Sequence, residues 1–343
     1  MKTRTGSVLL SAMLSGLFAA SLCFSTGAMA ASQNAQDMKI SGPYKSGNLS
    51  VFLIHGKDQI KAQNYLTLQE ALEQKKVVVN ETGDVNNLTV DNLSGSVVFI
   101  QSGDIVKGGR QDRTMQRDIL LQPNQKKVQL PAFCVEHGRW SGRAAEPTAS
   151  FQSAGDSIAG KELKMAAKQK ADQSAVWSAV SEAQSKLSHT LLKPVASPAS
   201  PSSYQLTLEN KDLKTATNKL VADLKPAADK ESDVVGYAFA INGKVNSADV
   251  YASHALFKKL WPKLLNSSAV EAVEEGDKKV TKDATEAQVR ACLTDADKAP
   301  VAEKNSSKSQ SFVVRSKENT RNIMFETFDT DHEVAVHKNY MTK

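Results

Sequence analysis

Cysteine is scarce in this chain of 343 residues, which has only three. Cys23 lies in a segment that we expect to be removed, so Cys134 and Cys292 remain. In an oxidising compartment these two could form one disulfide, but the sequence does not show that their Cα atoms lie within about 7 Å of each other. A scaffold held by several disulfides is excluded, and one bridge or two free thiols stay open.

Motifs that would announce a metal or a catalytic nucleophile are missing. The chain has six histidines but no His-x-His, Cys-x-x-Cys or His-Glu-x-x-His. His332 and His337 are five positions apart, which suits neither one face of a helix nor one face of a strand. No Gly-x-Ser-x-Gly elbow, typical of esterases, occurs. The sequence therefore predicts no metal site and identifies no cofactor.

Long apolar runs are missing beyond the N-terminus. Residues 8–24 are largely apolar, follow Lys2 and Arg4, and precede the small-residue pattern Ala-Met-Ala ending at Ala30. This order predicts a signal peptide cleaved near Ala30, and hence export to the periplasm or beyond the cell. Nothing downstream resembles a stop-transfer segment, so we expect no stable membrane insertion after cleavage.

A large excess of positive charge is missing as well. Removal of residues 1–30 would leave 41 basic and 37 acidic residues, a formal charge of +4. Proteins dedicated to nucleic acids usually concentrate much more positive charge on one face. We therefore expect no nucleic-acid partner.

Short strands dominate the first half of the chain. Residues 31–48 are polar and are predicted to be a loose lead-in, and residues 49–143 form a β-rich domain. Within this domain, Thr67 and Glu70 fit a capping box that opens a short helix. Regular short strands separated by Gly, Asn and Asp favour a barrel or a sandwich. The expected strands are residues 49–54, 77–79, 88–90 and 97–100.

The composition changes at residue 144. Residues 144–203 are rich in Ala, Ser, Gln and Lys, with apolar residues at helical spacing from 172 to 187. Three prolines among alanines and serines then break any helix in residues 194–203, which predicts a linker and a domain boundary.

Residues 204–343 have an α+β pattern. A helix near 213–224 precedes a strand at 234–241, and Asn242-Gly243 is a strong hairpin signal. Another helix follows Ser253, a plausible N-cap. The predicted class is therefore α+β: a β-rich N-terminal barrel or sandwich-like part, followed by an α+β part with hairpins and helices.

The first chemically rich motif is residues 103–114 (GDIVKGGRQDRT). Gly108 and Gly109 free the backbone for positive φ and close approach to a ligand. Arg110 and Arg113 offer planar guanidinium groups that suit phosphate or carboxylate. The pattern is neither a phosphate P-loop nor a dinucleotide fingerprint. An anion pocket and a salt-bridged surface hairpin both remain open.

Acidic residues accompany these arginines. Asp104, Asp112 and Asp118 could orient the guanidinium groups or serve as acids and bases. The second motif, residues 134–140 (CVEHGRW), adds Glu136 as a further acid, a histidine, an arginine and a tryptophan.

The second motif has its own two interpretations. Arg139 and Trp140 could hold a sugar or nucleotide through hydrogen bonds and stacking. Alternatively, Trp140 fills a core and Arg139 makes a structural ion pair. Cys134 lies in an apolar run, which favours a buried thiol or a bridge partner over a nucleophile.

The two motifs resemble those of a prokaryotic family, the domain associated with ARG (ADP-ribosylglycohydrolase) and the rhodanese-phosphatase superfamily. The similarity also includes residues 118–121 (DILL), 239–244 (FAINGK) and 256–265 (LFKKLWPKLL), so it covers most of residues 49–265. The family has no settled activity. Its name implies a neighbourhood in nucleotide or ADP-ribose metabolism, which is an association and not a mechanism.

Three functions are compatible with these residues. The first is a module that binds an anionic small molecule or glycan, such as a nucleotide, a sugar phosphate or an ADP-ribose-like compound. The second is a hydrolase acting on such a ligand, and the third is a structural or adaptor domain of the cell envelope. Candidate ligand contacts are Gly108, Gly109, Arg110, Arg113, Arg139 and Trp140; candidate bases are Asp104, Asp112 and Glu136.

Overall fold

A computed structural model describes residues 1–3, 35–60, 64–143, 145–279, 282–306 and 311–343. The chain divides into two units, Met1–Ala31 and Ser32–Lys343, and the following description concerns the second. The expected signal peptide and its cleavage site lie outside the described residues, apart from residues 1–3. Among the described helices, none combines the length and the apolar character needed to cross a membrane.

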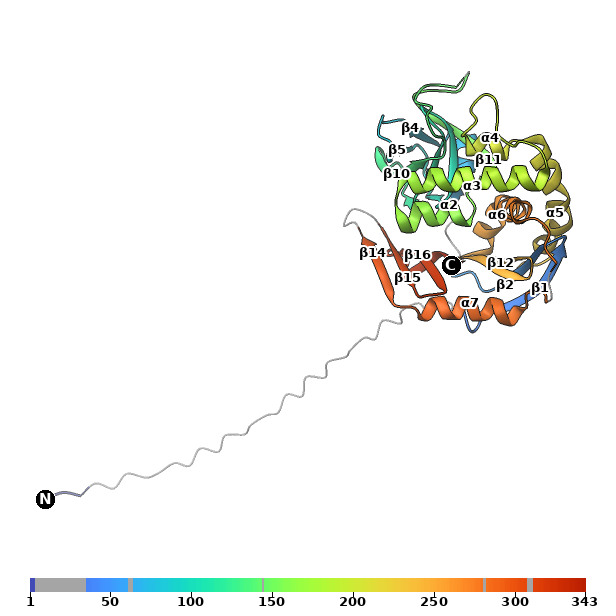
Figure 1. The fold of residues 1–343 in the computed structure, drawn as a ribbon. Helices are drawn as coiled ribbons and strands as arrows, with labels where there is room; N and C mark the ends of the chain where they lie inside the picture. The colour runs from blue at the N-terminus through green and yellow to red at the C-terminus, as the bar shows by residue number, and fades with distance from the viewer. Residues whose placement is uncertain (4–34, 61–63, 144, 280–281, 307–310) are drawn as a thin grey trace. The chain divides into compact units, whose positions relative to one another are not determined.

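An antiparallel sheet of eight strands forms one layer (Figure 1). Two of its inner strands, β2 (Leu49–His55) and β12 (Val234–Ile241), are almost wholly apolar and are buried along their full length, as expected of strands covered on both faces. The turn at Asn242 and Gly243 has positive φ at both residues, which confirms the predicted hairpin. The order is β1 (Lys39–Ser46), β2 (Leu49–His55), β12 (Val234–Ile241), β13 (Lys244–Tyr251), β17 (Val334–Thr342), β16 (Asn322–Asp329), β15 (Phe312–Glu318) and β14 (Val301–Ser306).

A second sheet of six strands is nearly closed on itself. A bridge between Asn80 and Ser150 links its two edge strands. This confirms the β-rich, barrel-like N-terminal part and the α+β class. The order is β11 (Phe151–Ile158), β7 (Asp104–Gly108), β8 (Arg113–Met115), β10 (Val128–Cys134), β5 (Asn87–Asn92) and β4 (Val77–Asn80), and a small sheet adds β3 (Leu66–Thr67), β6 (Val98–Ile100) and β9 (Ile119–Leu121).

The helix α6 (His254–Glu275) joins the two larger sheets. Its apolar side chains enter the main core, through Trp261 and Leu264, and a second core, through Val270 and Val273. It contacts β12 of the large sheet and β11 of the six-stranded sheet. Pro262 lies inside α6, and the helix continues through it. The side chains of α6 are buried on most sides, which is typical of a helix at the centre of a protein.

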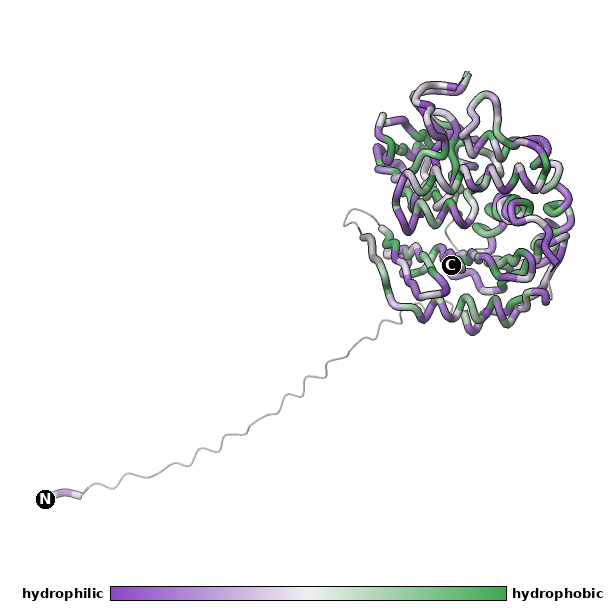
Figure 2. Tube along the Cα trace, in the orientation of Figure 1, coloured by the Kyte–Doolittle hydropathy of each residue, from purple (hydrophilic) through white to green (hydrophobic). Residues whose placement is uncertain are grey.

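A further helix, α7 (Glu286–Lys298), packs against the large sheet. Figure 2 shows polar and apolar residues alternating along α7, as in a helix with one face against a sheet. The remaining elements are α1 (Leu68–Glu73), α2 (Lys161–Met165), the π-helix η1 (Ala166–Lys170), α3 (Gln173–Leu191), α4 (Tyr204–Leu208) and α5 (Lys211–Asp229).

Two segments expected to be loose are ordered. Within the polar lead-in, residues 39–46 form β1, because this strand pairs with β2 at the edge of the large sheet. Residues 144–203 contain β11, α2, η1 and α3 instead of only one helix and a linker. Even the proline-rich part is anchored, since Val195 is fully buried in the second core and Ser203 is buried too.

Candidate functional site

The glycines of the first motif serve close packing of the chain. Gly108 and Gly109 have φ of 119° and 57°, so the expected positive φ is present. A Cβ on Gly109 would lie 2.3 Å from the ring of Phe151, and one on Gly108 would lie 3.1 Å from the carbonyl oxygen of Pro147. These glycines therefore let the hairpin between β7 and β8 press against the segment that leads into β11.

The acids of the two motifs meet in a buried cluster, here called the acid–arginine cluster: Asp112, Glu136, Arg139 and Arg143. Arg143 donates two bonds to the carboxylate of Asp112, at 3.0 and 3.1 Å, and one to Glu136 at 3.2 Å. Arg139 lies 2.7 Å from Glu136. Both carboxylates are fully buried. The cluster thus balances two buried negative charges with two guanidinium groups.

Serines from the proline-rich segment complete the cluster. The hydroxyl of Ser203 donates to Asp112 at 3.0 Å, and the hydroxyl of Ser200 donates to Glu136. Burial raises the pKa of Asp112 more than Arg143 lowers it. Burial also acts to raise the pKa of Glu136, but the bonds from Arg139 and Ser200 outweigh it and lower the pKa. Every carboxylate oxygen here already has a donor.

The remaining arginines of the motifs gather around Trp140. The guanidinium carbons of Arg110 and Arg113 lie 5.3 and 5.7 Å from the centroid of its ring, and the residue is 42% exposed. Arg113 is buried, lies 3.5 Å from Glu81 and donates to the carbonyl of Gln111 at 2.6 Å. The structure brings these predicted contacts together, and Glu81 already contacts the side chain of Arg113 and the backbone N–H of Arg110. Their role as ligand contacts stays a prediction.

Of the two alternatives left open for the cysteines, the structure has the free thiols. Both Cys134 and Cys292 are free. Cys134 ends β10, whereas Cys292 lies on α7, which packs against the large sheet. Burial raises the pKa of each thiol to about 11, so neither is an activated nucleophile near neutral pH.

Asp104 lies apart from the other predicted acids. It forms a buried ion pair with Lys263 of α6 and accepts a bond from the backbone N–H of Gln101 at 2.9 Å. This pair ties β7 to α6 and leaves Asp104 in a second, larger set of buried charges.

At the centre of that set, His337 lies between two buried aspartates. Its Nδ1 is 2.7 Å from Asp118, and its Nε2 is 3.0 Å from Asp249. Tyr251 stacks on the imidazole at 4.5 Å. Burial acts to lower the pKa of His337, but the charges and bonds of the two aspartates outweigh it and raise the pKa. The imidazole is therefore held in its charged form between two carboxylates.

A cavity of about 260 Å³ opens beside these charges. Its polar lining comes from Gln116 and Arg117 in the loop before β9, Lys168 and Gln169 in η1, and Arg315 in β15. The apolar side chain of Phe325 in β16 forms part of the wall. We call this space the basic cavity.

Lys168 is the most unusual residue of the basic cavity. Its Nζ lies 4.2 Å from the centroid of Phe325 and donates to Asn339 at 3.3 Å. Burial lowers its pKa to about 8, although Asp118 and Asp249 act in the opposite direction. A π-turn presents this side chain, and such turns are frequent at functional sites.

Sequence reasoning singled out Asp104 and Asp118 of this set of buried charges and none of the residues that line the basic cavity. His337 lies 219 residues from Asp118, so no local spacing could relate them. The pair of Lys164 and Lys168, four positions apart in a helical stretch, is the signal that could have been used.

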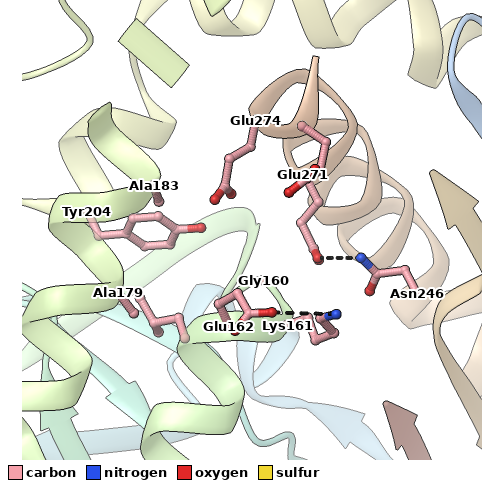
Figure 3. Close-up of a pocket in the computed structure, with 11 residues that line it drawn as sticks. Gly160, Lys161, Glu162, Ala179, Ala183, Tyr204, Asn246, Glu271 and Glu274 are labelled. Atoms are coloured by element: carbon pink, nitrogen blue, oxygen red, sulfur yellow. Dashed lines mark hydrogen bonds and ion pairs between the residues drawn. The ribbon is translucent and has the colours of Figure 1, made fainter. Parts of the chain in front are cut away.

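A smaller pocket of about 50 Å³ lies between α2, α3 and α6 (Figure 3). Glu271 and Glu274 of α6 face it, together with the phenol of Tyr204. Burial raises the pKa of both glutamates to about 7, and the neighbouring acids add to this. Its size suits water and not an organic ligand.

Comparison with known proteins gives one match. The family model described as "ARG and Rhodanese-Phosphatase-superfamily-associated Protein domain" matches residues 37–341. These residues include both motifs, the acid–arginine cluster, the basic cavity and His337. No curated protein and no solved structure matches the chain.

Proposed function

Because this chain belongs to the ARG and Rhodanese-Phosphatase-superfamily-associated Protein domain family, whose name gives no activity, we propose its function from the site alone. The protein binds a small anion in the basic cavity. The ligand carries a phosphate or a carboxylate, as in a sugar phosphate or a nucleotide fragment. Lys168, Arg117 and Arg315 supply the positive charge, and Phe325 offers an apolar surface to the rest of the ligand.

One observation carries this proposal. Three cationic side chains line the basic cavity, and none of its described lining residues is acidic. Arg315 also pairs with Glu326, which does not line the cavity, whereas in the acid–arginine cluster both Arg139 and Arg143 contact carboxylates that are fully buried. An incoming anion would have to displace those carboxylates from buried positions. The motifs led us to expect an anionic ligand. We keep that ligand class and place its binding site in the basic cavity instead of at the motifs.

The size of the cavity limits the ligand. Pockets for drug-sized molecules span roughly 300–1,000 Å³, and this cavity measures about 260 Å³. A monosaccharide phosphate or a dicarboxylate suits that volume better than a complete dinucleotide.

The acids near the basic cavity are already bonded to other groups of the protein, and this favours binding of the ligand over its hydrolysis. Both ring nitrogens of His337 are bonded to carboxylates, so neither can accept a proton from a ligand. Asp118 is bonded to His337 and also accepts from Thr327 at 2.7 Å. Of the groups at the cavity, Lys168 is the one with a pKa close to neutrality, about 8.

Thermal denaturation with a panel of anions tests the proposal. Inorganic phosphate, glucose 6-phosphate, ADP-ribose and citrate serve as probes. We expect at least one of them to raise the melting temperature of the wild-type protein and to have no such effect on Lys168→Met. Lys170→Met is the matched control, because Lys170 is an exposed lysine of the same π-helix.

Two outcomes would overturn this assignment. One is that none of the probes stabilises the wild-type protein. The other is that stabilisation survives in Lys168→Met and is lost in Arg110→Ala. This result would place the anion-binding site at Trp140 and its neighbouring arginines.

A further inference from the structure

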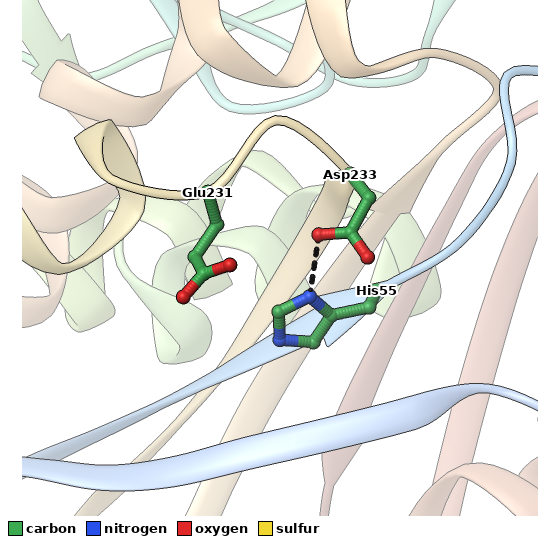
Figure 4. A group of neighbouring side chains, drawn as sticks. All are labelled: His55, Glu231 and Asp233. Atoms are coloured by element: carbon green, nitrogen blue, oxygen red, sulfur yellow. Dashed lines mark hydrogen bonds and ion pairs between the residues drawn. The ribbon is translucent and has the colours of Figure 1, made fainter.

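Three side chains gather at one end of the neighbouring strands β2 and β12 of the large sheet (Figure 4). His55 is the last residue of β2, Asp233 immediately precedes β12, and Glu231 lies two positions before Asp233. The strands fix two of them, since His55 pairs with Val234 and the N–H of Gly56 donates to the carbonyl of Asp233 at 2.9 Å. The positions of His55 and Asp233 are thus set by sheet register, and Glu231 lies in the segment between α5 and β12.

The imidazole of His55 is held on both sides. It is 4% exposed, its Nε2 lies 2.7 Å from the hydroxyl of Ser41, and its Nδ1 lies 2.8 Å from the carboxylate of Asp233. The bond to His55 lowers the pKa of Asp233, so this group stays a carboxylate at neutral pH. Among the described residues, none makes a hydrogen bond or an ion pair with Glu231 in this structure.

We propose that His55, Asp233 and Glu231 form a binding site for a divalent transition-metal ion such as Zn²⁺ or Mn²⁺. One ligand atom from each residue lies within 4.8 Å of the other two. Imidazole together with carboxylate oxygens suits these ions, whereas Ca²⁺ and Mg²⁺ prefer oxygen alone. This site is separate from the basic cavity and does not depend on the proposed anion.

The geometry requires little rearrangement. Neighbouring ligands of an ion with bonds of about 2.1 Å lie about 3 Å apart in octahedral geometry, and Nδ1 of His55 is 2.8 Å from Asp233. The ion would replace the proton between these two atoms. Glu231 then closes the third position, and both carboxylates are exposed, so water can fill the others.

Ser41 is placed to be the second hydrogen-bond partner of His55, one that contacts the imidazole and not the metal ion. A ligating imidazole usually donates its second N–H to an oxygen, which fixes the ring and its tautomer. In the metal-bound form, Nε2–H would donate to the Ser41 hydroxyl, and the lone pair of Nδ1 would face the ion between Asp233 and Glu231. His55 and Asp233 are 178 positions apart, so no motif in the sequence announces this site.

Titration of the chelator-treated full chain with Co²⁺ as a spectroscopic probe, and with Zn²⁺ by calorimetry, tests the proposal. We expect one ion per chain and visible Co²⁺ absorption that is lost in His55→Ala and in Glu231→Gln. Ser41→Ala should weaken the affinity by roughly 10–100-fold, the range found for outer partners.

His332→Ala is the matched control. His332 also bonds an aspartate, with Nδ1 2.9 Å from Asp329, but among the residues that the structure describes it belongs to no such group of three. Glu231 is exposed, so Glu231→Gln should fold even if His55→Ala does not. The proposal is wrong if the wild-type protein binds no Co²⁺ or Zn²⁺, or if Glu231→Gln binds as tightly as the wild type.

Discussion

Arg143 contacts both buried carboxylates of the acid–arginine cluster and is itself buried. Charges removed from water in this way are stable only as a set, because each desolvated ion needs its counter-charge. Arg139 and Arg143 thus have a structural use that is independent of any ligand. At the residue scale, the acid–arginine cluster holds the six-stranded sheet to the proline-rich segment.

Arg143→Ala should therefore destabilise the fold strongly. It removes one of the two arginines that Asp112 and Glu136 share, and breaking a buried pair typically costs about 3–5 kcal/mol. Arg110→Ala, at an exposed position, should change the free energy of unfolding by less than about 0.5 kcal/mol. Urea denaturation of both variants measures the difference. Equal stabilities would show that the cluster does not hold the fold.

Among the helices and strands, α6 connects several buried features of the molecule. It contributes to both cores, pairs Lys263 with Asp104, and presents Glu271 and Glu274 to the small pocket. Each of these glutamates has a folded pKa of about 7, above the ordinary value of 4.5. An acid with a raised pKa binds its proton more tightly in the folded state than in the unfolded chain.

This shift predicts a pH dependence of stability. Between pH 4.5 and 7 the folded state holds protons that the unfolded state has released, so stability falls as pH rises through this window. Glu271→Gln should remove part of that fall and be more stable than the wild type at pH 8. Thermal denaturation from pH 4 to 8 measures it; parallel curves for the two proteins would contradict the prediction.

Local signals in the sequence predicted elements well. The capping box at Thr67 and Glu70 and the hairpin at Asn242 and Gly243 are present, because each depends on residues at most a few positions apart. The composition of the proline-rich segment predicts a linker, and it does not show that Ser200 and Ser203 find buried carboxylates. The pairs of His337 with Asp118 and of His55 with Asp233 join opposite parts of the chain, so only the fold reveals them.

On the scale of the whole molecule, the family assignment covers nearly all of the described chain, while export stays a prediction. If it holds, the protein isolated from the periplasm or the medium begins near Ala31, as N-terminal mass spectrometry would show. Replacing Ala28 and Ala30 with Glu should block cleavage and retain the longer form. A full-length wild-type protein in the cytoplasm would contradict export.

The central claim is that Lys168 binds an anion, and its pKa provides the most direct test. The ammonium group is charged below about pH 8 and loses its charge above it. Calorimetric titration of the best-binding anion from pH 6.5 to 9.5 should therefore show affinity that falls as pH passes 8. Lys170→Met should keep this profile, and Lys168→Met should bind weakly with no such fall. Affinity that stays constant across this range in the wild type, or is unchanged in Lys168→Met, would contradict the account.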